Sequence, residues 1–324
     1  MANELYQKEN SKNFYEERYE KGYMDEWPHD KKQRVFEIIQ DLHLPEFGTA
    51  LDFGCGNGIF TEVIRQALPL WKVYGCDISK NAIDNAKIRF PECSFFVNNS
   101  VEKPNIQFDF LFSHHVLEHV FDIKNIVQEI NSFLKPESHM LHIFPCGNAN
   151  SFEYNVSNMR IDGINTEMEN RFFFEDEGHI RRLTSDQANT LMQECGFAIE
   201  KELVGGQHYV SLQWISDYGK EFILDFADMS KAINKEAETK LKRIKTKLLL
   251  LYRAKVIVND HTNNSYFKEL AYHLKMIVKI CIKIIAYPLA KLIVSYINKK
   301  EKQEWIQHKT DKNGAEMYLF YKRN

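Results

Sequence analysis

Several patterns that would assign a protein to a specialised class are missing from these 324 residues. The six cysteines form no Cys-x-x-Cys pair, so neither a zinc site nor a disulfide framework is indicated, and we expect reduced, mostly buried thiols. The chain starts with the polar stretch "MANELYQKEN" instead of an apolar run, which argues against a secretory signal. Internal repeats and low-complexity tracts are also missing. These absences favour an ordinary cytoplasmic globular protein.

The small net charge of −3 hides an asymmetry between the two parts of the chain. Residues 1–204 carry 20 Lys/Arg and 33 Asp/Glu, a balance of −13, whereas residues 205–324 carry 22 and 12, a balance of +10. Such a separation of charge suggests that the second part faces something anionic, or faces the first part.

Strand-like and helix-like segments alternate through the first 204 residues. Strands are expected at 49–53, 71–77, 93–97, 108–113, 139–144 and 197–204, and helices at 11–21, 31–42, 58–68, 79–90, 123–135 and 184–197. This alternation predicts an α/β fold with a doubly wound, mostly parallel sheet. We divide the chain into an N-terminal lid helix (1–30), a core (31–204), a helical insertion (205–314) and a last strand of the core sheet (315–324).

A glycine-rich turn, "LDFGCGNGIFT", lies between the first strand and its helix. Gly54, Gly56 and Gly58 leave the backbone bare, as a close ligand requires. Ile59 stands where a dinucleotide fingerprint has Gly or Ala, and no Gly-Lys-Ser/Thr of a P-loop follows. Asp77, at the end of the next strand, can accept hydrogen bonds from both hydroxyls of a ribose. The ligand predicted is a nucleoside without a pyrophosphate.

This set of motifs resembles the class I S-adenosylmethionine-dependent methyltransferases. "LDFGCGNG" matches the first motif of that family and the acid of "YGCDIS" matches the second. Later motifs of that family are similar to three further segments of this chain, "FDFLFSHHVLEHV", "INSFLKPESHMLHIFP" and "GHIRRLTSDQANTLMQECGF". The resemblance covers about residues 30–204 and the last strand. It implies a seven-stranded Rossmann-like methyltransferase fold, with an antiparallel seventh strand, and S-adenosyl-L-methionine as the cofactor.

The resemblance also implies a set of cofactor-binding residues. Asp52 would orient the glycine turn and approach the methionine amino group. Asp77 would bind the ribose and Ile78 would pack on the adenine. Asn99 stands where the family usually has an acid, and its amide oxygen can still accept the adenine amino group. The complete set is Asp52, Gly54, Cys55, Gly56, Gly58, Asp77, Ile78, Asn99, Ser100, Ser113 and His114.

Candidate catalytic histidines follow the fourth strand in "SHHVLEHV". If 115–119 begins a helix, His115 and His119 lie on one face and converge with Glu118. Three interpretations remain open: a general base, with His115 or His119 in that role; a magnesium site, as in methyltransferases with Glu-x-x-Glu-His here; or packing. His115 replaces the first Glu of that pattern, so we predict no metal.

Two further groups of residues carry open alternatives. His179 lies in a loop before a capped helix and is either a further catalytic residue or a surface histidine. Tyr15, Tyr19 and Trp27 form either a lid over the cofactor or the packing of an N-terminal helix.

The insertion contains two amphipathic segments, 235–258 and 272–300, and Pro288 is expected to kink or end the second. Lysines 275, 279 and 283 form a basic stripe there, and the cost in hydrocarbon of the three lysines between 279 and 291 argues against a membrane span. The segments predict either a cap on the core or contact of residues 235–300 with an anionic membrane, at its inner face. Nucleic acid is not expected, because the lysines alternate with aliphatic residues instead of stacking aromatics.

The sequence therefore predicts a methyltransferase (EC 2.1.1.-) that methylates an oxygen, rather than a nitrogen or carbon, of a small-molecule, glycan or lipid-linked acceptor. Two alternatives remain: a catalytically silent cofactor-binding module that docks to a membrane or a partner, and an RNA methyltransferase. The acceptor and the oligomeric state are not indicated.

Overall fold

The computed structural model describes residues 13–20, 22, 25–98, 100, 103–262 and 273–324, and describes only the backbone for 260–262 and 273–285. The chain divides into two compact units. Unit 1 comprises Met1–Pro145, Asp186–Glu202 and Met317–Asn324, and unit 2 comprises Cys146–Ser185 and Leu203–Glu316. This boundary differs from the division predicted above, because residues 146–185 hydrogen-bond to the segments that follow 203, for example Phe152 N–H to the Gln207 carbonyl.

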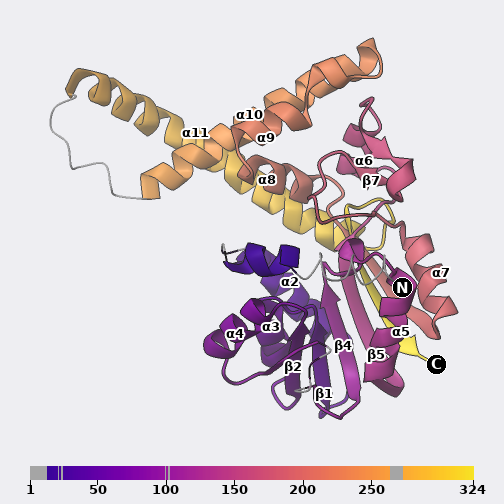
Figure 1. Cartoon of the computed structure of the whole chain (residues 1–324). Helices are drawn as coiled ribbons and strands as arrows, with labels where there is room; N and C mark the ends of the chain where they lie inside the picture. The colour runs from indigo at the N-terminus through magenta and orange to yellow at the C-terminus, as the bar shows by residue number, and fades with distance from the viewer. Residues whose placement is uncertain (1–12, 21, 23–24, 99, 101–102, 263–272) are drawn as a thin grey trace. The chain divides into compact units, whose positions relative to one another are not determined.

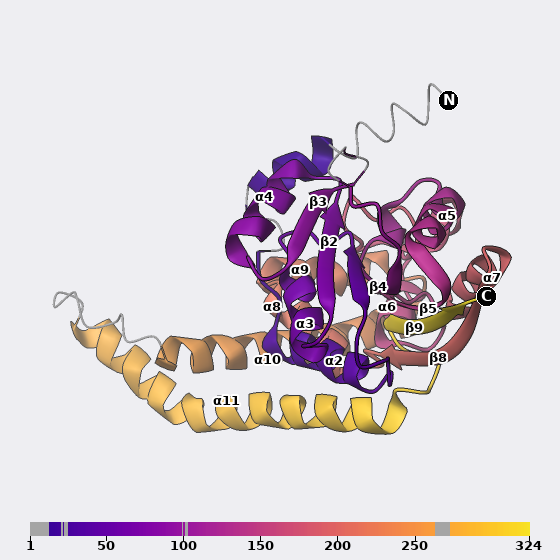
Figure 2. The same cartoon turned by 90° about the horizontal axis from the view of Figure 1, so that it is seen from below.

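Unit 1 is built on a seven-stranded sheet of order β3-β2-β1-β4-β5-β9-β8. The pairings of β1 with β2 and β4, of β2 with β3 and of β4 with β5 are parallel. Figure 1 shows β1, β2, β4 and β5 side by side, and Figure 2 shows β5, β9 and β8 together near the C-terminus. The strands are β1 (Thr49–Phe53), β2 (Lys72–Asp77), β3 (Ser94–Val97), β4 (Phe108–His114), β5 (Leu134–Pro145), β8 (Phe197–Gly205) and β9 (Glu316–Arg323).

Helices follow the strands as the alternation predicted. Residues 13–20 are helical, and the longer helices are α2 (His29–Gln40), α3 (Ile59–Ala67), α4 (Lys80–Arg89), α5 (Ile123–Phe133) and α7 (Ser185–Glu194). The helix α3 buries Ile59, Phe60, Val63 and Ile64 and packs on β1 and β2. Strand order reverses between β1 and β4, so the carboxyl ends of these strands form the edge where an open α/β sheet binds its ligand.

Two prolines lie inside regular elements, Pro136 in β5 and Pro288 in α11. The helix predicted over 123–135 ends at Phe133, and β5 begins at Leu134 and runs through Pro136. The register of β4 and β5 shifts near this point, where a residue without an N–H is tolerated. Pro288 lies inside α11, so the expectation that it ends the helix is wrong, and the alternative of a kink stays a prediction. Tertiary packing of the following turns, through Ile293 and Ile297, offsets the lost backbone hydrogen bond.

Unit 2 is mainly helical. Its apolar core includes Phe152, Leu212, Phe226 and Leu248, with Ile297 packed against it. The side chains of lysines 275, 279 and 283 lie outside the described residues. The elements are α6 (Phe152–Ser157), β6 (Ile164–Asn165), η2 (Thr166–Met168), β7 (Arg171–Phe172), α8 (Tyr209–Asp217), α9 (Lys220–Phe226), η3 (Met229–Lys231), α10 (Lys235–Thr262) and α11 (His273–His308).

Candidate functional site

The glycine turn between β1 and α3 has a backbone that only glycine adopts easily. Gly54, Gly56 and Gly58 have φ angles of +77°, +51° and +81°. A Cβ on Gly54 would lie 2.3 Å from Cγ2 of Val116. The N–H groups of Gly54 and Cys55 both donate to the carbonyl of Cys76, at 2.8 and 2.9 Å, which ties the turn to β2. The turn is therefore a fixed cradle at the carboxyl end of β1.

Asp77 ends β2 and is bonded to the same turn. Its Oδ2 accepts a hydrogen bond from the N–H of Gly56 and its Oδ1 accepts one from the N–H of Ser79, both at 2.9 Å. Burial raises the pKa of Asp77 above its ordinary value. The two hydrogen bonds act in the opposite direction but have a smaller effect. A carboxylate oxygen has a second lone pair, so ribose hydroxyls can donate to the same group. The residues present thus fit a nucleoside ligand.

Asp52 is a buried carboxyl group one residue from the end of β1. Its Oδ2 accepts a hydrogen bond from the hydroxyl of Thr61 at 2.6 Å, and only 1% of the residue is exposed. Burial raises the pKa of Asp52 to about 7, and the charge of Asp77 adds to this effect. Thr61 was missed by the sequence analysis, although its place in the first turn of α3 could have identified it. A nearby cation, such as an amino group, would favour the ionised form of Asp52.

The histidines after β4 are arranged differently from the prediction. Residues 115–119 do not begin an α-helix: His115 has a φ of +54°, and only Leu117–His119 form a short 3₁₀ turn, η1. The Nδ1 of His115 lies 2.8 Å from Oε1 of Glu118, whose side chain is 2% exposed. His119 instead shares a hydrogen bond of 2.7 Å between its Nδ1 and the hydroxyl of Tyr15. The left-handed backbone at His115 is the reason, because it breaks the helical spacing.

The N-terminal segment contacts the glycine turn and the start of α4. The carboxylate of Glu16 accepts hydrogen bonds from the Ser79 hydroxyl at 2.8 Å and the Lys80 N–H at 2.7 Å. A Cβ on Gly56 would lie 2.7 Å from the hydroxyl of Tyr19, so this hydroxyl lies against the turn. The lid role of Tyr15, Tyr19 and Trp27 stays a prediction, and Glu16 is a residue that the sequence analysis missed.

Trp27 packs on the first two histidines of the segment. Ring centroids of Trp27 lie 4.7 Å from His114 and 5.7 Å from His115, and Phe60 lies 4.2 Å from His114. Ser113 and His114 are buried at the end of β4. These aromatic contacts hold the imidazoles in place beside the glycine turn.

The remaining predicted cofactor residues are only partly described. Asn99 lies outside the described residues, and Ile78 and Ser100 are half-buried. Cys55 is a free, buried thiol whose pKa burial raises well above its ordinary value. The prediction of buried thiols outside disulfides is confirmed for Cys55, Cys76, Cys93, Cys146 and Cys195.

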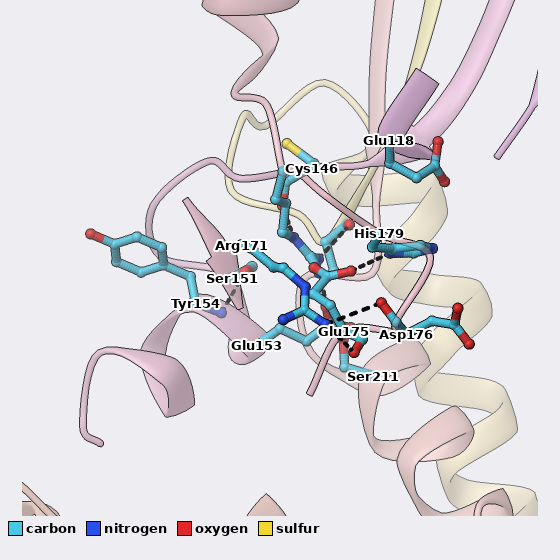
Figure 3. A network of polar contacts seen from close by, with 12 residues as sticks. Glu118, Cys146, Ser151, Glu153, Tyr154, Arg171, Glu175, Asp176, His179 and Ser211 are labelled. Carbon is cyan, nitrogen blue, oxygen red and sulfur yellow. Dashed lines mark hydrogen bonds and ion pairs between the residues drawn. The ribbon is translucent and has the colours of Figure 1, made fainter. Parts of the chain in front are cut away.

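His179 belongs to unit 2 and to a network of buried charges there (Figure 3). Its Nδ1 pairs with Glu175, which also forms an ion pair of 2.6 Å with Arg182. Arg182 forms a second ion pair of 2.6 Å with Glu153. Burial acts to raise the pKa of Glu175, but Arg182 and His179 hold it below its ordinary value. The surface interpretation of His179 is wrong, since its side chain is only 14% exposed.

The fold and the cradle define an α/β protein that binds a nucleoside cofactor at the carboxyl edge of its sheet. The chain belongs to a methyltransferase domain family, whose model matches residues 23–202. The predicted class I methyltransferase fold, the transferase class EC 2.1.1.- and the cofactor S-adenosyl-L-methionine are confirmed by this membership.

The curated relatives cover a shorter stretch. A malonyl-[acyl-carrier protein] O-methyltransferase from Calditerrivibrio nitroreducens is 26% identical over 33% of this chain and 42% of its own length. A trans-aconitate 2-methyltransferase from Enterobacter sp. is 28% identical over 33% of this chain and 42% of its own length. The chain thus matches less than half of the length of these relatives.

Among solved structures, the YcgJ protein from Bacillus subtilis is 16% identical, with a TM-score of 0.46. That match covers 65% of this chain and 88% of YcgJ.

Proposed function

We propose that this protein transfers the methyl group of S-adenosylmethionine to an oxygen atom of a small-molecule acceptor, with His115 as the general base. The observation that carries the proposal is the pair of His115 and Glu118 at the carboxyl end of β4. The trans-aconitate methyltransferases among the relatives support a small, polar acceptor, and the O-methyltransferase supports oxygen as the methylated atom. Glycans and lipid-linked molecules are the alternative acceptors in this proposal.

The short distance within the pair, 2.8 Å from Nδ1 to Oε1, supports an oriented base. Glu118 is a buried carboxylate, and its contact with Nδ1 favours the tautomer in which that nitrogen holds the proton. In this tautomer Nε2 is the nitrogen that accepts a proton. The left-handed φ of His115 is a strained conformation, and such strain is often kept at functional sites.

The cofactor supplies an electrophilic methyl group on a sulfonium sulfur. The glycine turn and Asp77 would hold its nucleoside, and Asp52 would face its amino group. His115 takes the proton of the acceptor hydroxyl while that oxygen forms its bond to the methyl carbon. The sulfur keeps the electron pair of the broken bond. Orientation and proton removal are therefore the contributions of the protein, and no covalent enzyme intermediate is needed.

A single-turnover assay tests the base. The substitutions His115→Gln and Glu118→Gln are compared with His29→Gln, an exposed histidine at the start of α2. Acceptors are phenols, hydroxy acids and polyprenyl-linked sugars, with amines and RNA as the contrasting classes. We expect His115→Gln to lower the methylation rate by a factor of about 10²–10⁴ while the affinity for S-adenosylmethionine stays unchanged.

The outcomes separate the alternatives. A full rate in His115→Gln rejects the base, and the parallel variants His119→Gln and His179→Gln then show whether another candidate histidine has that role. Transfer to RNA, with an affinity that falls as salt rises, would replace the proposal by an RNA methyltransferase. Cofactor binding without methyl transfer to any of these classes of acceptor would indicate a catalytically silent cofactor-binding module.

A further inference from the structure

The exposed side of the helix α10 carries more positive than negative charge. Between residues 239 and 259 the sequence has seven Lys or Arg residues and no Asp or Glu. Lys255 is paired with Asp217 and Lys240 with Glu236. The side chains of Lys242, Arg243, Lys247 and Arg253 are exposed on the outer side of the helix. Unit 2 thus presents a cationic helix face.

Apolar side chains are exposed beside these cations. Leu250 of α10 is 54% exposed and follows Arg243 and Lys247 by seven and three residues, which places the three on one helix face. The inner face of α10 is already buried, through Leu241 and Leu248. The outward leucine is therefore not needed for the core of unit 2.

The helix α11, which packs against α10, repeats this pattern. Leu289, Leu292 and Tyr296 are 62%, 66% and 54% exposed, and their spacing of three and four residues puts them on one face. Lys299 extends that face and is also exposed. The acidic Glu301 is buried on the other side of the helix. Both helices therefore expose leucines among lysines and arginines.

We propose that the basic–apolar faces of these two helices, with Lys242, Arg243, Lys247, Leu250 and Arg253 on α10 and Leu289, Leu292, Tyr296 and Lys299 on α11, bind the surface of an anionic lipid bilayer. Lysine and arginine attract anionic headgroups, and leucine and tyrosine enter the boundary between headgroups and acyl chains. Tyrosine is itself enriched at this boundary. The readout below does not depend on methyl transfer, so the proposal stands or fails apart from the proposed function.

Other occupants fit these side chains less well. A second copy of the chain would bring two cationic faces together, which costs electrostatic energy. A nucleic acid would match the charge but not the leucines, since single strands bind through stacked aromatic rings. No helix among the described residues is long and apolar enough to cross a bilayer, so the contact proposed is with its surface.

Vesicle flotation with the full chain tests the proposal. The probes are vesicles of phosphatidylcholine alone and of phosphatidylcholine with phosphatidylglycerol. We expect binding to the anionic vesicles and little binding to the neutral ones. The triple variant Arg243→Gln, Lys247→Gln and Lys299→Gln should bind about a hundredfold more weakly, because each lost charge weakens binding roughly fivefold. The variant Leu289→Ser, Leu292→Ser and Tyr296→Ser should bind about tenfold more weakly or worse.

Matched controls come from exposed residues of unit 1 and of α9. Phe47→Ser, Leu70→Ser and Ile88→Ser remove as many exposed apolar side chains, and Lys72→Gln, Lys87→Gln and Lys220→Gln remove as many charges. Both controls should bind like the wild type, and circular dichroism should show all variants folded.

Three results would overturn the proposal. One is equal binding to neutral and anionic vesicles, another is equal loss in the controls, and the third is no binding at all. If no vesicle binding is seen, light scattering shows whether the wild type is a dimer. A wild-type dimer that becomes a monomer in the variant Leu289→Ser, Leu292→Ser and Tyr296→Ser would assign these side chains to contact with a second copy of the chain.

Discussion

The carboxylate of Asp77 accepts a hydrogen bond of 2.9 Å from the backbone N–H of Gly56, across the gap between the end of β2 and the turn after β1. This bond joins the two parts of the cofactor site that the sequence identified separately. A single carboxylate therefore orders the glycine turn and offers its remaining lone pairs to a ligand.

Replacement of Asp77 by Ala should remove cofactor binding. Two hydrogen bonds to an ionised group are lost, at about 1.5–3 kcal/mol each, so the dissociation constants of S-adenosylmethionine and its demethylated product should rise at least about a hundredfold. Isothermal titration calorimetry measures both dissociation constants. Asp84→Asn, an exposed carboxylate on α4 that pairs with Lys80, is the control and should bind normally. Unchanged affinity in Asp77→Ala would contradict the assignment.

The contact of Gly54 with Val116 should be visible as a coupling energy. Gly54→Ala places a Cβ 2.3 Å from Val116 Cγ2, whereas Gly196→Ala meets nothing closer than 3.8 Å, and both glycines have positive φ. Gly54→Ala should lower the free energy of unfolding by about 1–3 kcal/mol more than Gly196→Ala does. The reason is that only the Cβ added at position 54 is forced against a neighbouring side chain. Adding Val116→Ala should recover most of that difference in a double-mutant cycle. Additive losses would exclude the clash.

Cofactor binding should release protons near neutral pH through Asp52. In the free protein the pKa of this carboxyl is raised to about 7 by burial, so it is about half protonated at pH 7. An amino group bound beside it favours the ionised form and lowers that pKa. Affinity should therefore rise as the pH increases through 7. Calorimetry at pH 7 in phosphate and in Tris should show proton release for the wild type, and Asp52→Asn should reduce it. A variant that releases as many protons as the wild type would rule out Asp52 as the source.

His142 should make the protein less stable in acid. Its side chain is fully buried in β5, neither ring nitrogen has a hydrogen-bond partner among the described residues, and burial lowers its pKa to about 3. Because the unfolded chain takes up this proton near pH 6.5 and the folded chain does not, stability falls as the pH decreases from about 6.5 towards 3. The slope is at most about 1.4 kcal/mol per pH unit.

The variant His142→Leu should lack this part of the pH dependence and should be more stable at pH 7 by about 1 kcal/mol. Urea unfolding at several pH values measures both effects. His139→Leu, a half-buried histidine on the same strand, is the control and should change the slope less. Identical slopes for the wild type and His142→Leu would disprove the account.

Arg182 should be essential to unit 2. Two buried carboxylates, Glu153 and Glu175, share this one guanidinium, and burial raises the pKa of Glu153. Arg182→Met leaves both carboxylates without their cation and should lower the free energy of unfolding by about 3–5 kcal/mol. Arg181→Met is the control, since its partner Glu169 is exposed and can return to water. Thermal unfolding followed by circular dichroism compares the two, and equal losses would argue against the network.

The order of helices and strands could be predicted because each is determined by short segments of sequence. A buried strand, "TALDF", followed by glycines and an amphipathic helix predicts its own conformation. Asp77 could be placed for the same reason, since parallel strands bring their carboxyl ends to one edge. The helix expected at 115–119 failed because a left-handed residue other than glycine or asparagine, here His115, has no reliable signal in the sequence.

The sequence alone determined the class of this protein: the alternating pattern sets the sheet, and the glycines with Asp77 set a nucleoside site. Only the tertiary structure decided which residues act together. Glu16 and Ser79 are 63 residues apart in the chain, and Tyr15 and His119 are 104 apart. Such pairs depend on how the chain folds back on itself, and the periodicity of local segments contains no information about that.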